Sequence, residues 1–252
     1  ILTECLILML YRSMQRQGLM FNKPSPSSYT INVLLVIFLL LFANCVRIIT
    51  KGTTPTMYVI SHIVVLIIYI GILVSWGMSV YDRIVHKSIR RYLVILMGLM
   101  MFWMLMRTLR HTVFLHVFPV GQWCWYAYYI PMILIPQFCF LAMKYVGKPE
   151  DYHMPKIWHI INIPSVILIL GILTNDLHQW AFRFHQGYVA GGDVYQRGFL
   201  YNAAVVWIFI CIAMMLIEVI KNCRIPGTHK VIWRPIAMLG IGVLYTILYT
   251  ID

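Results

Sequence analysis

The side chains best suited to binding chemistry stand together in residues 173–184, LTNDLHQWAFRF, where a long apolar run ends. Residues three or four positions apart share one face of a helix. If the helix continues past Thr174, its apolar face carries Leu173, Leu177, Trp180 and Phe184, and its polar face carries Asp176, Gln179 and Arg183. The spacing therefore predicts an amphipathic helical extension. Its candidate ligand-sensing residues are Asn175, Asp176, His178 and Gln179.

Two arginines near the end of another apolar run, Arg107 and Arg110, are candidate counter-charges for these residues. Arg107 follows Tyr92 by about 15 residues, which places it about 22 Å into a membrane core of about 30 Å. At that depth a guanidinium either extends to the membrane surface or pairs with an acid. Both alternatives stay open, and the second predicts an ion pair between Arg107 and Asp176.

An aromatic segment, WCWYAYYIPMILIP at residues 123–136, begins a further apolar run. Trp and Tyr collect at the membrane–water interface, and prolines inside a helix remove donors and tend to kink it. One interpretation is therefore an interfacial belt followed by a kink. The other is an aromatic-walled cavity for an apolar or cationic ligand, with Trp125, Tyr126 and Tyr129 as its wall.

Catalytic and metal-binding motifs are missing from the sequence. The histidines near these segments, His111, His116, His178 and His185, do not have the spacing of metal ligands. The chain contains no phosphate-binding loop, no HExxH zinc helix and no GxSxG nucleophile elbow. Glu218, beside Lys221 and Arg224, is interpreted as part of a helix-end ion pair. We expect no enzyme activity, metal or cofactor in these residues.

Composition places all of these residues in an integral membrane protein. The 252 residues are 61% hydrophobic and 11% charged, whereas a soluble domain carries about a quarter charged residues. The net charge of +12 does not indicate nucleic-acid binding, because the basic residues lie in short loops between apolar runs. The six cysteines contain no C-x-x-C pair, so neither a zinc ribbon nor a disulfide scaffold is indicated.

Seven apolar segments predict an all-α, polytopic bundle of transmembrane helices. They are Ile31–Ile49, Tyr58–Val80, Tyr92–Phe114, Trp123–Val146, Ile157–Thr174, Leu200–Ile220 and Val231–Ile251. A segment with a Pro/Ser linker, residues 1–30, precedes them. Because the sequence begins at Ile1 and ends inside an apolar run, we interpret it as a fragment and expect one more span after Asp252.

The distribution of basic residues predicts the orientation of the bundle. One side holds 14 of the 20 lysines and arginines: Arg12, Arg16, Lys23, Arg83, Lys87, Arg90, Arg91, Lys144, Lys148, Lys156, Lys221, Arg224, Lys230 and Arg234. The other side holds 6: Arg47, Lys51, Arg107, Arg110, Arg183 and Arg197. The positive-inside rule predicts a multi-pass protein of the cell membrane with a cytoplasmic N-terminus and with Asp176 on the outer side.

Three blocks in this order resemble the seven-transmembrane sensor region at the N-terminus of bacterial histidine kinases and related signalling proteins. They are SIRRYL (88–93) running to FWMLMRTL (102–109), WYAYYIPM (125–132) with Pro136, and LTNDLHQ (173–179). The resemblance implies an outward N-terminus of the sensor unit, seven spans and a cytoplasmic C-terminal output module. The domains are then residues 1–30, a cytoplasmic segment; 31–50, an additional transmembrane helix; and 56–252, a C-terminally truncated seven-transmembrane sensor-like domain.

The leading functional prediction is a membrane-embedded input domain that passes an extracytoplasmic or intramembrane stimulus to an output module, a histidine kinase. The expected partners are the lipid bilayer, an unidentified small-molecule or membrane stimulus, an output domain in the same chain and a second copy in a homodimer. One alternative is a small-molecule transporter, because Pro131, Pro136 and Pro164 could interrupt helices near the membrane middle. The other alternative is a structural membrane subunit.

Overall fold

The computed structural model describes residues 38–39, 42–43, 45–46, 49–50, 54–83, 86–114, 117–146, 148–184 and 195–222. The elements are α3 (Pro55–Arg83), α4 (Lys87–Thr112), α5 (Val120–Ala127), α6 (Tyr129–Met143), a 3-10 helix η1 (Lys156–Ile161), α7 (Asn162–Leu173), α8 (Asn175–His178), β1 (Phe182–Arg183), β2 (Gln196–Arg197) and α9 (Phe199–Asn222). The predicted helical bundle is therefore present, with one addition. The strands β1 and β2 form a short antiparallel pair in which Phe182 lies opposite Arg197.

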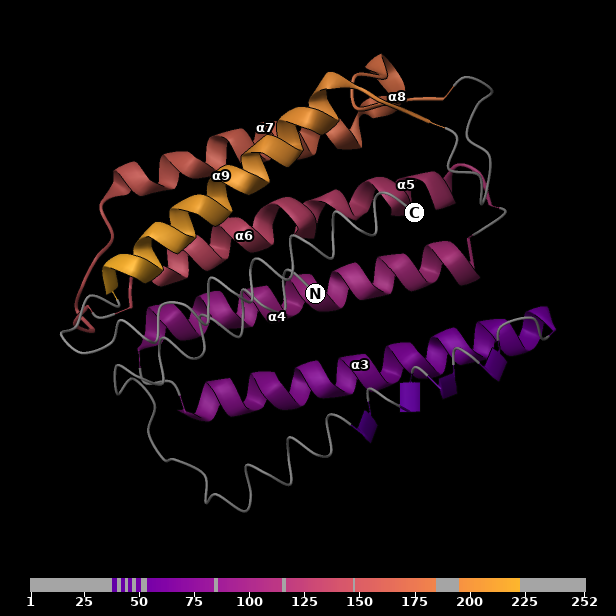
Figure 1. Cartoon of the computed structure of the whole chain (residues 1–252), viewed down its shortest axis with the longest axis horizontal. Helices are drawn as coiled ribbons and strands as arrows, with labels where there is room; N and C mark the ends of the chain where they lie inside the picture. The colour runs from indigo at the N-terminus through magenta and orange to yellow at the C-terminus, as the bar shows by residue number, and fades with distance from the viewer. Residues whose placement is uncertain are drawn as a thin grey trace.

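The long helices lie side by side in the order α3, α4, α6 and then α9 with α7 (Figure 1). Helix α4 packs against α3 on one side and against α5 and α6 on the other, and α6 packs against α7 and α9. One end of this bundle carries α5, α8 and the start of α9, and we call it the Asn175 end. The opposite end carries the last turns of α6 and α9, and we call it the Lys144 end.

Five segments of the described residues are long and apolar enough to cross a membrane: Thr56–Met78, Lys87–Thr112, Val120–Met143, Lys156–Leu173 and Phe199–Lys221. Each coincides, within a few residues, with one of the segments predicted from apolar runs. The predicted span at residues 31–49 is described only in part. The predicted span at 231–251, the segment at 1–30 and any span after Asp252 lie outside the described residues.

The span Val120–Met143, which joins α5 and α6, is the central one. Its most apolar window is 67% buried, against 11% for Thr56–Met78 and 17% for Lys87–Thr112. A helix that is apolar on all sides but mostly exposed in the bundle has a surface suited to lipid. The α5–α6 span instead packs against protein, and most of the aromatic and proline residues of 123–136 are buried there.

A small residue lies where α9 approaches α7. A Cβ atom added at Gly171 would lie 2.7 Å from Cδ2 of Leu200. Small residues at helix contacts in membranes let backbones approach closely. The same arrangement joins α3 and α4, where a Cβ atom at Gly77 would overlap the Met97 thioether.

A buried polar network joins α6, α7 and α9 inside the bundle. The Gln137 amide donates to the side-chain oxygen of Asn162 and accepts from the Ser165 hydroxyl, and the indole N–H of Trp207 donates to Ser165 Oγ at 2.8 Å. Gln137 and Ser165 are fully buried. Because no water replaces such partners inside a membrane, each group depends on the others.

Replacing Ser165 with alanine is therefore expected to destabilise the bundle by about 1–2 kcal/mol, since it leaves the Trp207 N–H and the Gln137 carbonyl without Ser165. The matched control is Ser61→Ala. Ser61 is equally buried, but its hydroxyl donates to the Tyr58 carbonyl one turn earlier in its own helix. Thermal midpoints of the purified proteins in one detergent give the comparison. Equal losses for both variants would contradict an inter-helix role for Ser165.

Candidate functional site

The centre of the site is Asn175, whose side chain is fully buried at the start of α8. Its Oδ1 accepts the backbone N–H groups of Ala181 at 2.9 Å and Phe182 at 3.0 Å. Its Nδ2 donates to the Phe182 carbonyl at 3.0 Å and to the Tyr126 hydroxyl at 3.1 Å. One amide thus uses both of its ends to hold the chain after α8 against α5.

Asp176, the next residue, is exposed, but its Oδ1 is held by two groups of α5. The Tyr126 hydroxyl and the Gln122 amide each donate to this oxygen at 2.7 Å. Gln122 also donates to the Tyr126 hydroxyl at 2.6 Å. The Tyr126 hydroxyl therefore accepts hydrogen bonds from Gln122 and Asn175 and donates one to Asp176. The carboxylate is fixed from the protein side while the residue remains accessible.

The aromatic residues of α5 and α6 are mostly packed inside the bundle. Trp125 contacts the ring of Phe182 at 4.5 Å between centroids and that of Tyr195 at 4.8 Å, and Tyr129 contacts Phe182 at 5.3 Å. Trp125, Tyr126 and Tyr129 are all buried, whereas Trp123 is 55% exposed. The interfacial-belt interpretation therefore fits Trp123. The three candidate wall residues form the core around Phe182, and their contact with a ligand stays a prediction.

The two candidate arginines have different positions. Arg110 is buried, and its guanidinium lies over the rings of Trp125 at 5.4 Å and Tyr128 at 5.8 Å. Arg107 is exposed, and its backbone carbonyl accepts the Tyr128 hydroxyl at 3.5 Å. Cations over aromatic faces are stabilised by the ring quadrupole. Arg110 is thus part of the aromatic cluster, and Arg107 lies on its surface.

The predicted ion pair between Arg107 and Asp176 is not formed. Where both residues of a pair are described, the ion pairs are those of Glu218 with Lys144 and Lys221. Asp176 instead accepts from the neutral donors of Gln122 and Tyr126. The reason is that α8 turns the Asp176 side chain towards α5, while Arg107 lies exposed on α4.

The predicted helical extension past Thr174 is also wrong beyond His178. Helix α7 ends at Leu173, α8 has four residues, and Gln179 adopts a left-handed conformation with φ of 52°. The Asn175 side-chain oxygen then accepts the N–H groups of Ala181 and Phe182, which backbone carbonyls would accept in a continuing helix. Leu177 is consequently 86% exposed, and Phe182 is the residue of this segment that fills the core.

His178 and Gln179 complete the turn. Nδ1 of His178 accepts the backbone N–H of Trp180 at 3.0 Å, and its ring packs against the Trp180 indole at 4.9 Å. Gln179 is exposed, and its backbone N–H donates to the Asn175 carbonyl at 2.7 Å. Among the described residues, no group of three or more His, Cys, Asp or Glu side chains could hold a metal ion. His116 and His185 lie outside those residues.

The turn is joined directly to the start of α9. The Ala181 carbonyl accepts the Gly198 N–H at 2.8 Å, and the Trp180 carbonyl accepts the Leu200 N–H at 3.2 Å. Asn175 and its partners Tyr126, Ala181 and Phe182 are called the Asn175 hub. With the β1–β2 pair, the bonds of Gly198 and Leu200 connect the Asn175 hub to α9, which reaches the other end of the bundle (Figure 1). Sequence reasoning missed Gln122, Phe182 and Gly198. A glycine directly before a long apolar helix was the available signal for Gly198.

Comparison with known proteins identifies the family. No curated protein and no solved structure matches the chain. Residues 59–251 match the family described as the N-terminal 7TM region of histidine kinase. The match covers most of the sequence and includes the three residue blocks at 88–109, 125–136 and 173–179 that carry the resemblance. The chain therefore belongs to the family of N-terminal seven-transmembrane regions of histidine kinases.

Proposed function

We propose that the chain is the membrane-embedded input domain of a bacterial signalling protein, which senses a stimulus at the Asn175 end and regulates a histidine kinase output domain in the same protein. Family membership supports the role of sensor region over those of transporter and structural subunit. A homodimer with the output domain in the cytoplasm is part of the proposal. The basic residues Lys87, Arg90, Arg91, Lys144, Lys148, Lys156 and Lys221 gather at the Lys144 end, which supports placing that end inside.

The observation that carries the proposal is the Asp176 carboxylate, which is accessible and is also bonded to α5 through Tyr126 and Gln122. A stimulus that contacts Asp176 competes for these bonds or strengthens them. Tyr126 is bonded in turn to Asn175, which holds the segment leading to α9. A ligand shifts a conformational equilibrium only by the difference in its affinity for the two states. In this proposal, the stimulus contacts Asp176 differently in the two states, and this contact gives the difference in affinity.

Replacing Asp176 with asparagine tests the proposal in the full-length protein in membranes. Asparagine keeps the shape and an acceptor oxygen but loses the charge, and charged acceptors form the stronger hydrogen bonds. We expect the basal rate of autophosphorylation to change by roughly fivefold. Tyr126→Phe, which removes the donor to Asp176, is expected to change the rate in the same direction.

The matched control is Asp151→Asn, an exposed aspartate between α6 and η1. This variant should retain the parent rate. If Asp176→Asn also retains it while folding normally, Asp176 does not couple to the output. If the full-length protein has no kinase activity at all, the proposed output is wrong.

A further inference from the structure

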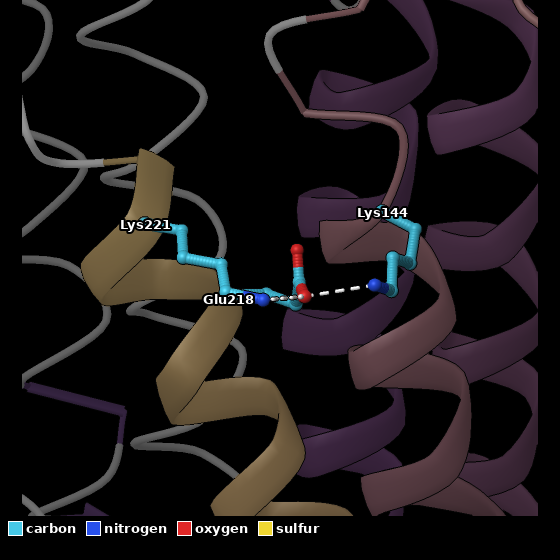
Figure 2. Close-up of polar contacts among 3 residues, drawn as sticks. All are labelled: Lys144, Glu218 and Lys221. Atoms are coloured by element: carbon cyan, nitrogen blue, oxygen red, sulfur yellow. Dashed lines mark hydrogen bonds and ion pairs between the residues drawn. The ribbon is translucent and has the colours of Figure 1, made fainter.

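At the Lys144 end, one carboxylate is shared by two lysines from different positions (Figure 2). Oε1 of Glu218 lies 2.7 Å from Lys144 Nζ and 3.4 Å from Lys221 Nζ. The two ammonium groups approach the carboxylate from either side. Lys144 directly follows α6, whereas Glu218 and Lys221 both belong to the last turns of α9. One contact therefore joins two helices, and the other stays within one helix.

The two contacts differ in their exposure. The side chains of Lys144 and Glu218 are each 13% exposed, whereas that of Lys221 is 62% exposed. Exposed pairs three residues apart on one helix contribute little, because water and salt screen them. Removing one partner of a partly buried pair has a larger effect, since the remaining charge is left in a poorly solvated place. Lys144 is therefore the stronger partner of Glu218 in this structure.

Lys144 also has a second set of contacts that does not depend on α9. Its ammonium lies 3.7 Å from the ring centroid of Trp158, in η1, and 5.4 Å from that of Phe140, in α6. A cation over the face of Trp is stabilised without a counter-ion. If α9 moved away from α6 at this end, Lys144 would keep its aromatic contacts and Glu218 would keep Lys221. Neither charge would be left without a partner.

We propose that Lys144, Glu218 and Lys221 form an exchange latch that gives the end of α9 two stable positions relative to α6. In the first position Glu218 binds both Lys144 and Lys221, as in this structure. In the second Glu218 binds Lys221 alone, and Lys144 stays over Trp158. The latch rests on the proposed function, in which α9 connects the Asn175 hub to the output. It gives that function a bistable element, which coupling between distant sites requires.

Electron–electron distance measurements on the full-length protein in liposomes test the latch. Spin labels on non-natural amino acids replace the exposed residues Lys148, after α6, and Ile217, in α9. Lys144→Met is expected to change the population ratio of the two distances by roughly tenfold or more, the consequence of losing a charge-assisted hydrogen bond. Glu218→Gln is expected to shift it in the same direction.

Two control variants make the result specific. Lys144→Arg keeps the charge and should keep the parent distance distribution. Lys221→Met removes only the exposed partner, so it should change the ratio by less than about threefold and towards the first position, in which Glu218 binds Lys144. An unchanged distribution in Lys144→Met, or equal shifts from Lys144→Met and Lys221→Met, would overturn the latch.

The distances are measured without a stimulus, so they separate the latch from the sensor function. Shifted distances with an unchanged autophosphorylation rate support the latch and count against the proposed coupling to a kinase. If Asp176→Asn changes the autophosphorylation rate while Lys144→Met leaves the distances unchanged, the sensor function is supported and the latch is overturned.

Discussion

Replacing Gly198 with alanine is expected to destabilise the protein by about 3 kcal/mol or more. A Cβ atom at Gly198 would overlap the carbonyl oxygen of Trp180 and lie 2.7 Å from its carbonyl carbon. These are backbone atoms, so no side-chain rotation relieves the overlap. The Gly198–Ala181 and Leu200–Trp180 hydrogen bonds lie at the same point and would be stretched or broken. We expect the start of α9 to separate from the turn after α8.

The control for this variant is Gly98→Ala, in α4, where an added Cβ atom meets nothing within 4 Å. Alanine is favoured over glycine inside a helix by about 1 kcal/mol, so this change should stabilise the protein. Thermal midpoints in one detergent then move in opposite directions for the same chemical change. Gly198→Ala with a midpoint equal to or above that of the parent protein would show that α9 is not held by this contact.

The transmembrane helices could be predicted because their signal is contained in the local sequence. The apolar run Leu200–Ile220, for example, corresponds to α9 at Phe199–Asn222. An apolar stretch of about twenty residues has few stable alternatives in a membrane. Which helix lies at the centre was not predictable in the same way, because the buried α5–α6 span is less apolar than the mostly exposed segment Thr56–Met78, so apolar character does not rank the helices by burial.

The segment after Thr174 shows where periodicity fails. The spacing of Leu173, Leu177 and Trp180 fits a helix, yet the chain leaves the helix at Gln179. Asn and Asp compete with helices by bonding to nearby backbone groups. The side-chain oxygen of Asn175 accepts the backbone N–H groups of Ala181 and Phe182, six and seven residues later. It takes the place of the backbone carbonyls that would accept these groups in a helix.

The partners of the candidate site could not be inferred from spacing along the chain. Gln122 is 54 residues from Asp176, and Lys144 is 74 residues from Glu218. Only the packing of α5 against α7 and α8 and of α6 against α9 brings them together. The predicted helix-end ion pair of Glu218 with Lys221 was confirmed because both residues lie on one helix turn. Arg224, its other predicted partner, lies outside the described residues.

Replacing Asn175 with alanine is expected to cost about 3–5 kcal/mol, at the high end for a single substitution. The change leaves the buried N–H groups of Ala181 and Phe182 and the Phe182 carbonyl without the Asn175 amide. It also removes one donor from Tyr126. The loss should release Phe182 from the aromatic core and separate α8 from α5, even in the absence of any stimulus.

Asn202→Ala is the matched control, because Asn202 is exposed on the first turns of α9 and alanine is the better helix former. Its thermal midpoint should equal or exceed that of the parent protein, while Asn175→Ala should lower the midpoint strongly. If Asn175→Ala melts like the parent protein, the amide does not hold this end of the bundle together. A large loss of stability makes Asn175 a positioning residue, which holds the turn that carries the exposed Asp176.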